Sequence, residues 1–345
     1  MEYAIIISVI AMVVIAAFML LGGNAEKAFC SLSNSIGAAA WCQQSPGNSP
    51  PARIGPVAAD DPVTNRLVMF GGAGVCGATC NDTWTWTGTT WNQLSPATSP
   101  SARWGSQMAL DPVTKRLILF GGLGAAGVPL ADTWTWTGMT WSQLSPATSP
   151  PGRYGAGMAV DANGRIVLFG GSSTACLICN DTWTWTGATW AQVAANPAGC
   201  SSSCVGSPPG REYVSMATYP GNGNIIMFGG SNTGAGPGLG DTWSWNGTAW
   251  SQLSPATSPS QRFDAITVVD PGLGTVVVFG GGAPCGSKND TWAWSGSTWN
   301  EINSPTSPAG RCVSVMGVDP TTNHDIMFSG GDQPWPNYLT DTWSI

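Results

Sequence analysis

Residues 103–150 read RWGSQMALDPVTKRLILFGGLGAAGVPLADTWTWTGMTWSQLSPATSP, and this order of motifs decides the fold. The unit starts at an arginine and runs through an apolar stretch to an Asp-Pro turn or its equivalent. A β-branched run then ends in Phe-Gly-Gly or a variant, and a variable Gly-rich loop leads to Asp-Thr-Trp and a Ser-Pro linker. The same order recurs from Arg53, Arg153, Arg211, Arg262 and Arg311. A period near fifty residues is typical of repeat folds, in which each unit packs on its neighbours.

Each unit is predicted to contain four β-strands. Its short apolar segments are separated by Asp-Pro, Gly-Gly, Thr-Gly and Ser-Pro pairs, which favour turns. Trp84 and Trp86 are two residues apart, so both face one side of a strand, and Trp91 follows a Thr-Gly turn on the next strand. Seventeen of the nineteen tryptophans occupy such positions. They are therefore predicted to pack sheets together rather than to form a ligand surface.

The number of units and their ends predict a closed ring. The Asp-Thr-Trp triplet occurs six times, but the sixth unit stops at DTWSI and has no fourth strand. The segment WCQQSPGNSP at 41–50 matches WNQLSPATSP at 91–100, so a strand at 41–44 is expected to complete the last sheet. The repeat resembles the kelch repeat over the whole of residues 38–345. The expected fold class is an all-β, six-bladed, kelch-like β-propeller with a long N-terminal hydrophobic α-helix.

The N-terminal segment, residues 1–37, is predicted to form that helix as a separate domain. The segment Ala4–Leu21 contains only one polar side chain, Ser8. The segment is long enough to span a membrane. A cleaved signal peptide would carry a basic start, whereas the first charge here is the acid Glu2. A plain membrane anchor fits the length but leaves Glu2 and Tyr3 unexplained.

Residues 2–37 resemble the Flp class of type IVb pilins, the subunits of Tad pili. The resemblance rests on the Glu2–Tyr3 pair, the apolar run and the weakly amphipathic stretch with Phe29, Leu32 and Ile36. One departure is that only Met1 precedes the Glu-Tyr pair. The resemblance implies a helix that first lies in the cytoplasmic membrane and then packs with copies of itself in a filament core. Glu2 would there pair with the amino terminus of a neighbouring subunit.

The ten cysteines favour disulfides in an oxidising compartment over free thiols. Ten candidates are spaced mostly in close pairs: Cys30, Cys42, Cys76, Cys80, Cys176, Cys179, Cys200, Cys204, Cys285 and Cys312. A Cys285–Cys312 bridge between two blades is plausible from the loop geometry, and Cys30 with Cys42 would fix the helix to the closing strand. The spacing of the four central cysteines also resembles a zinc site. Disulfides are favoured there, with their pairing left open.

The six arginines that start the units are half of all basic residues. The first and third strands of a blade run in the same direction, so each arginine lies on the face where an Asp-Thr-Trp strand begins. We therefore expect a ring of Arg–Asp pairs that ties the blades together on this face. Unpaired, solvated arginines are the alternative.

Residue counts argue against catalysis and against metal or nucleic-acid binding. The single histidine, His324, lies in a turn, so neither a copper site nor a Ser-His-Asp site is expected. The net charge of −7, with basic residues spread evenly, gives no footprint for nucleic acid. No cofactor is expected.

Two functions remain. The first is a structural subunit of an extracellular pilus: a homo-oligomeric filament whose propellers lie outside, able also to adhere. The alternative is a membrane-anchored, kelch-like surface protein that binds glycans or other surface ligands, with Trp335 and Tyr338 in the loop GDQPWPNYLT as the candidate contacts. Four Asn-x-Thr sites, Asn81, Asn180, Asn246 and Asn289, are weak candidates for glycosylation.

Overall fold

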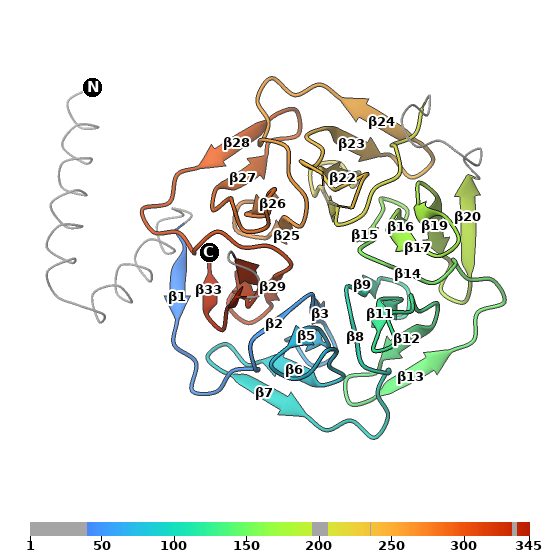
Figure 1. Ribbon diagram of the computed structural model, residues 1–345, viewed down its shortest axis with the longest axis vertical. Helices are drawn as coiled ribbons and strands as arrows, with labels where there is room; N and C mark the ends of the chain where they lie inside the picture. Colours follow the sequence, from blue (N-terminus) through green and yellow to red (C-terminus); the bar gives the residue numbers. More distant parts are fainter. Residues whose placement is uncertain (1–39, 195–205, 235, 333–336) are drawn as a thin grey trace, which may run out of the picture.

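The computed structural model describes residues 40–194, 206–234, 236–332 and 337–345. Within these residues, six four-stranded antiparallel sheets stand around a central axis as the blades of a propeller (Figure 1). Listed from the innermost strand outwards, blade 1 comprises β3 (Val57–Asp61), β4 (Arg66–Phe70), β6 (Thr83–Trp86) and β7 (Trp91–Leu94); blade 2, β9 (Gln107–Asp111), β10 (Arg116–Phe120), β12 (Thr133–Trp136) and β13 (Trp141–Leu144); blade 3, β15 (Gly157–Val160), β16 (Ile166–Phe169), β19 (Thr182–Trp185) and β20 (Trp190–Ala194).

The other three blades repeat this order. Blade 4 comprises β21 (Ser215–Thr218), β22 (Ile225–Phe228), β23 (Thr242–Trp245) and β24 (Trp250–Leu253); blade 5, β25 (Ile266–Asp270), β26 (Thr275–Phe279), β27 (Thr291–Trp294) and β28 (Trp299–Ile302); blade 6, β29 (Val315–Asp319), β30 (His324–Phe328), β33 (Thr342–Ser344) and β1 (Cys42–Gln44). Short sheets of two or three strands accompany the blades: β2 (Arg53–Ile54) with β5 (Ala73–Gly74); β8 (Arg103–Trp104) with β11 (Leu123–Gly124); β14 (Arg153–Tyr154) with β17 (Ser172–Ser173) and β18 (Leu177–Ile178); and β31 (Gly331–Asp332) with β32 (Asn337–Tyr338).

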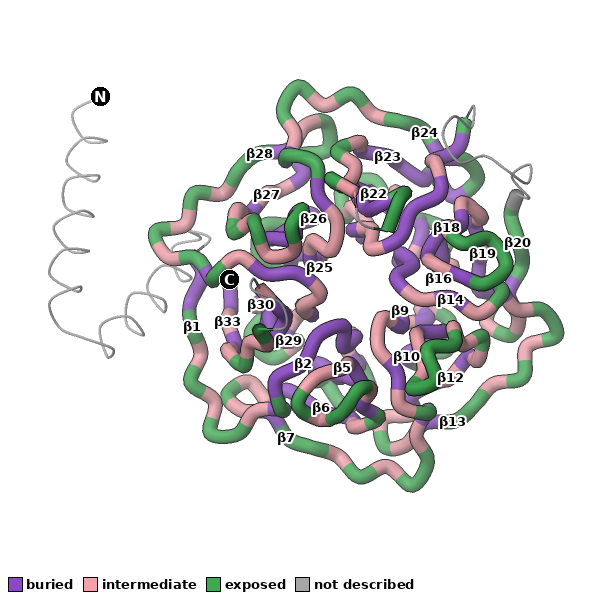
Figure 2. Tube along the Cα trace, in the orientation of Figure 1, coloured by how far each residue is buried: buried purple, intermediate pink, exposed green. Residues whose placement is uncertain are grey.

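The hydrophobic core lies between the blades. The second strand of a blade is buried on both faces, as in β4, where Leu67 to Phe70 are all buried. This explains why the strand reads as a continuous apolar run instead of alternating with polar residues. Each buried cluster joins two neighbouring blades; one unites Val68 and Phe70 of blade 1 with Leu119 and Trp141 of blade 2. Exposed residues follow the rim of the ring (Figure 2).

A tryptophan at the start of each outermost strand links its blade to the preceding one. The Trp141 indole Nε1 donates to Thr83 Oγ1 at 3.0 Å, and its ring packs on Phe70 with centroids 5.3 Å apart. The equivalent hydrogen bonds run from Trp41 to Thr291, Trp91 to Thr342, Trp190 to Thr133, Trp250 to Thr182 and Trp299 to Thr242. Because all six junctions are made, the ring is closed.

The closing junction uses strands from opposite ends of the described chain. β1 pairs antiparallel with β33, with Cys42 opposite Ser344, and forms the outer strand of blade 6. Trp41, just before it, is fully buried and packs on Phe279 with centroids 4.9 Å apart. Every blade therefore has four strands and no long sheet edge lies open.

The fold class predicted from the sequence needs correction. The described residues form strands and no helix, so the fold that the structure supports is an all-β propeller without the long helix. That helix was inferred from an apolar run and a resemblance, whereas the blades follow from a repeat in which every unit constrains its neighbours. Residues 1–37, for which the helix was predicted, lie outside the described residues. In the part of the chain that the structure describes, no helix has the length and apolarity needed to span a membrane.

Candidate functional site

Six buried arginines position the segments that lead into the innermost strands. Arg103, fully buried, donates from Nη1 and Nη2 to the two carboxylate oxygens of Asp132 at 2.6 and 2.7 Å. Its Nη1 also donates to the Gly121 carbonyl at 2.9 Å. The same fork joins Arg53 to Asp82, Arg153 to Asp181, Arg211 to Asp241, Arg262 to Asp290 and Arg311 to Asp341. Two parallel bonds fix the orientation of each guanidinium as well as its charge.

The Arg–Asp pairs expected from the sequence form in all six blades, but each pair lies within one blade. The arginine main chain makes the link between blades. Arg103 leads into blade 2, and its backbone binds two residues of blade 1: Gly72 N donates to Arg103 O, and Arg103 N donates to Cys80 O. Equivalent bonds run from Gly122 to Arg153, Gly171 to Arg211, Gly230 to Arg262, Gly281 to Arg311 and Gly330 to Arg53. Each arginine thus holds its own blade by its side chain and the preceding blade by its backbone.

Two residues after each arginine, the chain turns into the central channel in a left-handed conformation. The six residues and their φ angles are Gly55 (58°), Gly105 (65°), Gly155 (62°), Tyr213 (53°), Asp264 (55°) and Val313 (53°). Their main chains form a series of five hydrogen bonds around the channel, from Gly55 N to Val313 O through to Asp264 N to Tyr213 O. Glycine adopts this conformation without steric cost, whereas other residues are strained by about 1–2 kcal/mol.

The channel forms a cavity of about 200 Å³ lined by the first residues of the innermost strands of all six blades. Blades 1 to 3 contribute glycine at the turn, so backbone faces the opening there. Blades 4 and 5 contribute the side chains of Tyr213 and Asp264, and blade 6 contributes Val313. The cavity is therefore asymmetric although the fold that surrounds it repeats.

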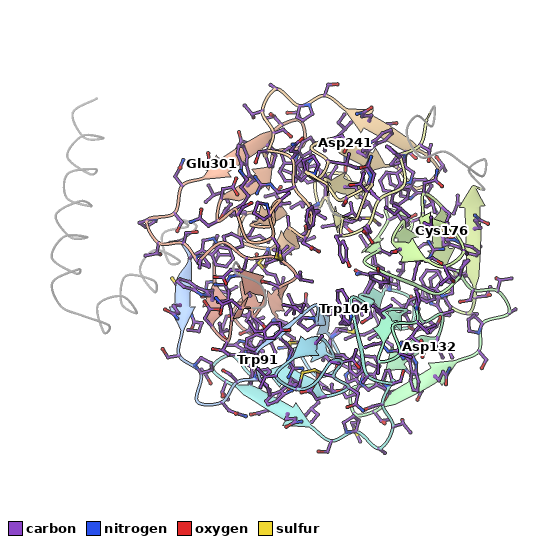
Figure 3. All side chains as sticks on the ribbon, viewed as in Figure 1. Trp91, Trp104, Asp132, Cys176, Asp241 and Glu301 are labelled. Carbon is purple, nitrogen blue, oxygen red and sulfur yellow. A yellow bond between two sulfur atoms is a disulfide. The ribbon has the colours of Figure 1, made fainter. Side chains whose placement is uncertain are left out.

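Three aromatic residues form an arc beside this mouth, and one of them, Tyr213, lines the cavity itself. Trp104 and Tyr154 have ring centroids 5.7 Å apart, and Tyr154 and Tyr213 have centroids 6.1 Å apart. The rings lie over the glycines of the preceding blades: a Cβ on Gly55 would be 2.9 Å from Trp104 Cε3, and one on Gly155 would be 3.0 Å from the Tyr213 ring. All three rings are half-buried. Figure 3 shows Trp104 beside the centre of the ring.

Two carboxylates flank Tyr213. Burial raises the pKa of Glu212, which is partly offset by a hydrogen bond from Ser172. Burial, with the charge of Glu212 second, raises the pKa of Asp264 well above its usual value. The pKa of Tyr213 is raised first by burial and then by the charges of Asp264 and Glu212. The three groups therefore share one poorly hydrated patch in which negative charge is costly.

A family model, the KLHDC2/KLHL20/DRC7 Kelch-repeats domain, matches residues 10–205, which is more than half of the 345 residues. The chain belongs to the kelch-repeat family. A kelch-repeat domain indicates a β-propeller that interacts with other proteins. The match supports the kelch part of the expected resemblance, and no pilin of the Flp or Tad type was found. No curated protein matches the chain.

Three disulfides have both cysteines in the described part of the kelch propeller: Cys76–Cys80, Cys176–Cys179 and Cys285–Cys312. The last joins the β26–β27 loop of blade 5 to the start of blade 6. Cys176 and Cys179 pair with each other, which leaves no role for them in a zinc site. Cys42 is also disulfide-bonded. Its expected partner Cys30, together with Cys200 and Cys204, lies outside the described residues.

The other predicted site residues do not gather in one place. Glu2, Tyr3 and Trp335 lie outside the described residues, and Tyr338 is half-buried in β32. Asn81, Asn246 and Asn289 are exposed, whereas Asn180 is half-buried. The side-chain oxygen of Asn246 accepts from Thr248 N and Ala249 N in a tight turn. Glycosylation at these sites stays a prediction. No cluster of three potential metal-binding side chains occurs among the residues that the structure describes.

The residues of the channel mouth were missed in the sequence. Trp104, Tyr154, Glu212, Tyr213 and Asp264 all follow a unit-starting arginine by one or two positions. These positions vary between units while the arginine before them does not. That local variation was the signal that could have identified them, because variable side chains on a repeated frame are where a specific surface is built.

Proposed function

We propose that this kelch propeller is a binding protein whose ligand site is the mouth of the central channel, and that it acts by binding a protein segment rather than by catalysis. The observation that supports this most strongly is the aromatic arc Trp104–Tyr154–Tyr213 beside an open cavity. Half-buried aromatic rings with accessible faces contribute large contact area at low entropic cost, and they dominate many protein interfaces. A channel of this size accepts side chains of a peptide, not a folded domain.

We further propose that the propeller works outside the cytoplasm. Three disulfides among the described residues support this location, because disulfides form and persist mainly in oxidising compartments.

A random peptide library displayed on phage and panned against the whole chain tests the proposed site. We expect enriched peptides that compete with one another for one site and lose binding when Trp104→Ala or Tyr154→Ala is introduced. Glu301→Gln, on the outer strand β28 at the rim (Figure 3), should leave their binding unchanged. Failure to enrich any peptide, or enriched peptides insensitive to both aromatic substitutions, would remove the channel mouth as the site.

The filament function that residues 2–37 predict stays a second proposal. In this proposal the chain passes through the membrane, assembles into a homo-oligomeric filament and adheres to surface glycans. It rests on residues outside the described part, and the family match gives it no support. The disulfides favour an extracellular location for either function. Electron microscopy of the secreted protein tests it: helical fibres are expected, and a preparation of single rings only would rule it out.

A further inference from the structure

The three non-glycine residues at the left-handed turns mark the part of the mouth that carries specificity. Gly55, Gly105 and Gly155 occupy the same position in blades 1 to 3, so the fold accepts glycine there. Tyr213 and Val313 keep a side chain in a backbone conformation that residues other than glycine rarely adopt, and Val313 is also β-branched. Strain of this kind persists where the side chain has a use.

The mouth carries acidic groups and no basic one. Asp264 lines the cavity, Glu212 is buried close to Asp264, and none of the residues that line the cavity is basic. The six arginines beneath the mouth contribute no free positive charge, because each is matched by a bidentate aspartate. Arg66, Arg116 and Arg165 lie at turns beyond the opposite ends of the innermost strands.

The aromatic arc adds to the attraction of the mouth for a cation. The face of an aromatic ring is negative and attracts a cation that lies within about 6 Å of its centre. Tyr213 lies next to Glu212 and Asp264, Tyr154 packs on Tyr213, and Trp104, the strongest such ring type, packs on Tyr154 farther round the mouth. Aromatic faces combined with carboxylates select organic cations over neutral or anionic groups.

From this geometry we infer that the channel mouth binds an organic cation, an ammonium or guanidinium group, with Asp264 and Glu212 as its counter-charges and the Trp104–Tyr154–Tyr213 arc as its aromatic wall. The inference rests on the proposed function: it names the chemical group through which a bound segment would be recognised. A lysine or arginine side chain of a partner and a free alkylammonium share this chemistry.

The raised pKa values of the two acids agree with a cation that is missing from the free protein. Burial raises the pKa of both Asp264 and Glu212, and the charge of Glu212 adds to the effect on Asp264. A bound cation would stabilise both ionised forms. Binding should therefore release protons, which isothermal titration calorimetry detects as a dependence of the binding heat on the buffer.

Calorimetry with defined peptides tests the inference directly. The probes are Ac-Gly-Gly-Lys-Gly-Gly-NH2, its arginine and norleucine counterparts, and n-butylammonium. We expect the lysine or arginine peptide to bind at least about tenfold more tightly than the norleucine peptide, because only the charged side chains form charge-assisted hydrogen bonds with a carboxylate. Tighter binding of the peptides than of n-butylammonium assigns the cation to a peptide, and the reverse assigns it to a small molecule.

The decisive variant is Asp264→Asn. Asparagine has the same shape and adopts the left-handed conformation readily, so the fold should be kept while the charge is removed. We expect a loss of about tenfold or more in affinity for the cationic peptides, with Glu212→Gln acting in the same direction. Glu301→Gln changes the net charge equally at the rim and should have no effect. Thermal unfolding checks that each variant is folded.

The possible failures are distinguishable. If the norleucine peptide binds as well as the lysine peptide, or Asp264→Asn binds like the wild type, the cation inference is wrong. Phage-derived peptides that still depend on Trp104 would then leave the proposed binding function in place. If no peptide of either kind binds at the mouth, both fall together.

Discussion

A buried arginine is stabilising only when its charge and most of its donors are matched, and the six arginines of this propeller meet that condition. Burial alone would raise the pKa of Asp132, but the hydrogen bonds and charge of Arg103, with the Trp134 indole at 2.7 Å, outweigh it and hold the pKa below its usual value. The other five aspartates of these pairs behave alike. Since these folded-state pKa values are lowered, the stability they provide is present above about pH 4 and is lost as the pH falls further.

Arg103→Ala should destabilise the protein by about 3–5 kcal/mol, because it leaves the charge of Asp132 without its partner in a half-buried site. Urea unfolding at pH 7 measures the loss. The matched control is Arg116→Ala, an exposed arginine at the start of β10, expected to change stability by less than about 0.5 kcal/mol. Equal effects of the two substitutions would mean that the buried pairs contribute nothing special.

Asp325→Leu should stabilise the protein, and more so at pH 8 than at pH 5. The fully buried Asp325 carboxylate has no hydrogen-bond partner among the described residues, while the equivalent residues of blades 1 and 2 are Leu67 and Leu117. Burial, followed by the charges of Asp270 and Asp60, raises its pKa well above 3.8. The folded state therefore retains a proton that the unfolded state releases, and stability falls as the pH rises from about 4.

The gain from Asp325→Leu is expected to reach about 1–3 kcal/mol at pH 8. Thermal unfolding at the two pH values measures it. A loss of stability at both would show that the carboxylate is matched by a group in solution.

At the scale of single residues, the sequence was enough to predict the Arg–Asp pairs but not Asp325 or the channel mouth. An arginine equivalent to Arg103 and an aspartate equivalent to Asp132 recur in every unit. Strand direction then indicates that the two pair with each other. Asp325, Tyr213 and Asp264 each depart from their unit. The role of such a residue can be inferred only from its surroundings in the folded protein. Asp325 lies in the core between blades, and Tyr213 and Asp264 lie at the cavity.

Among the elements, the strands carry the stability and the loops between the second and third strands carry the cross-links. The Cys285–Cys312 disulfide closes 27 residues and joins two blades, whereas Cys76–Cys80 closes only 4 residues within one. Loop entropy in the unfolded chain makes the longer closure more stabilising. Strand positions followed directly from the repeated turns, and the Cys285–Cys312 bridge was expected because both cysteines lie on the same face of the ring. The pairing of Cys176 with Cys179 depends on a loop path that turn signals do not specify.

Replacing Cys285 and Cys312 together by alanine should cost about 3.5 kcal/mol, against about 2 kcal/mol for the Cys76 and Cys80 double replacement. Guanidinium unfolding of the two variants under identical conditions gives the comparison. A larger loss in the Cys76 and Cys80 variant would contradict the entropic account.

For the molecule as a whole, stability depends on six equivalent junctions, one of which joins the two ends of the described chain. That junction was predictable because 41–50 repeats the pattern of 91–100. The sequence does not predict the asymmetry of the channel, since it arises from side chains that different blades bring to a single opening. The fold follows from what the units share, and the candidate site from where they differ.

Trp41→Ala should destabilise the protein as much as Trp141→Ala, by about 3–5 kcal/mol each, because each indole is fully buried and bonded to a threonine of the neighbouring blade. Chemical unfolding monitored by circular dichroism tests this. A nearly neutral Trp41→Ala beside a costly Trp141→Ala would indicate that the ring is open in solution.

The pairing of β1 with β33 has a consequence for biosynthesis. Cys42 leaves the ribosome about 300 residues before its partner Ser344, which at about 5–20 residues per second is a delay of roughly 15–60 s. During that interval Trp41 lacks the residues of blade 5 on which it packs, and two nascent chains that meet can exchange strands. A chaperone that shields this early segment would raise the yield, and only a fully translated molecule can present a finished channel to its ligand.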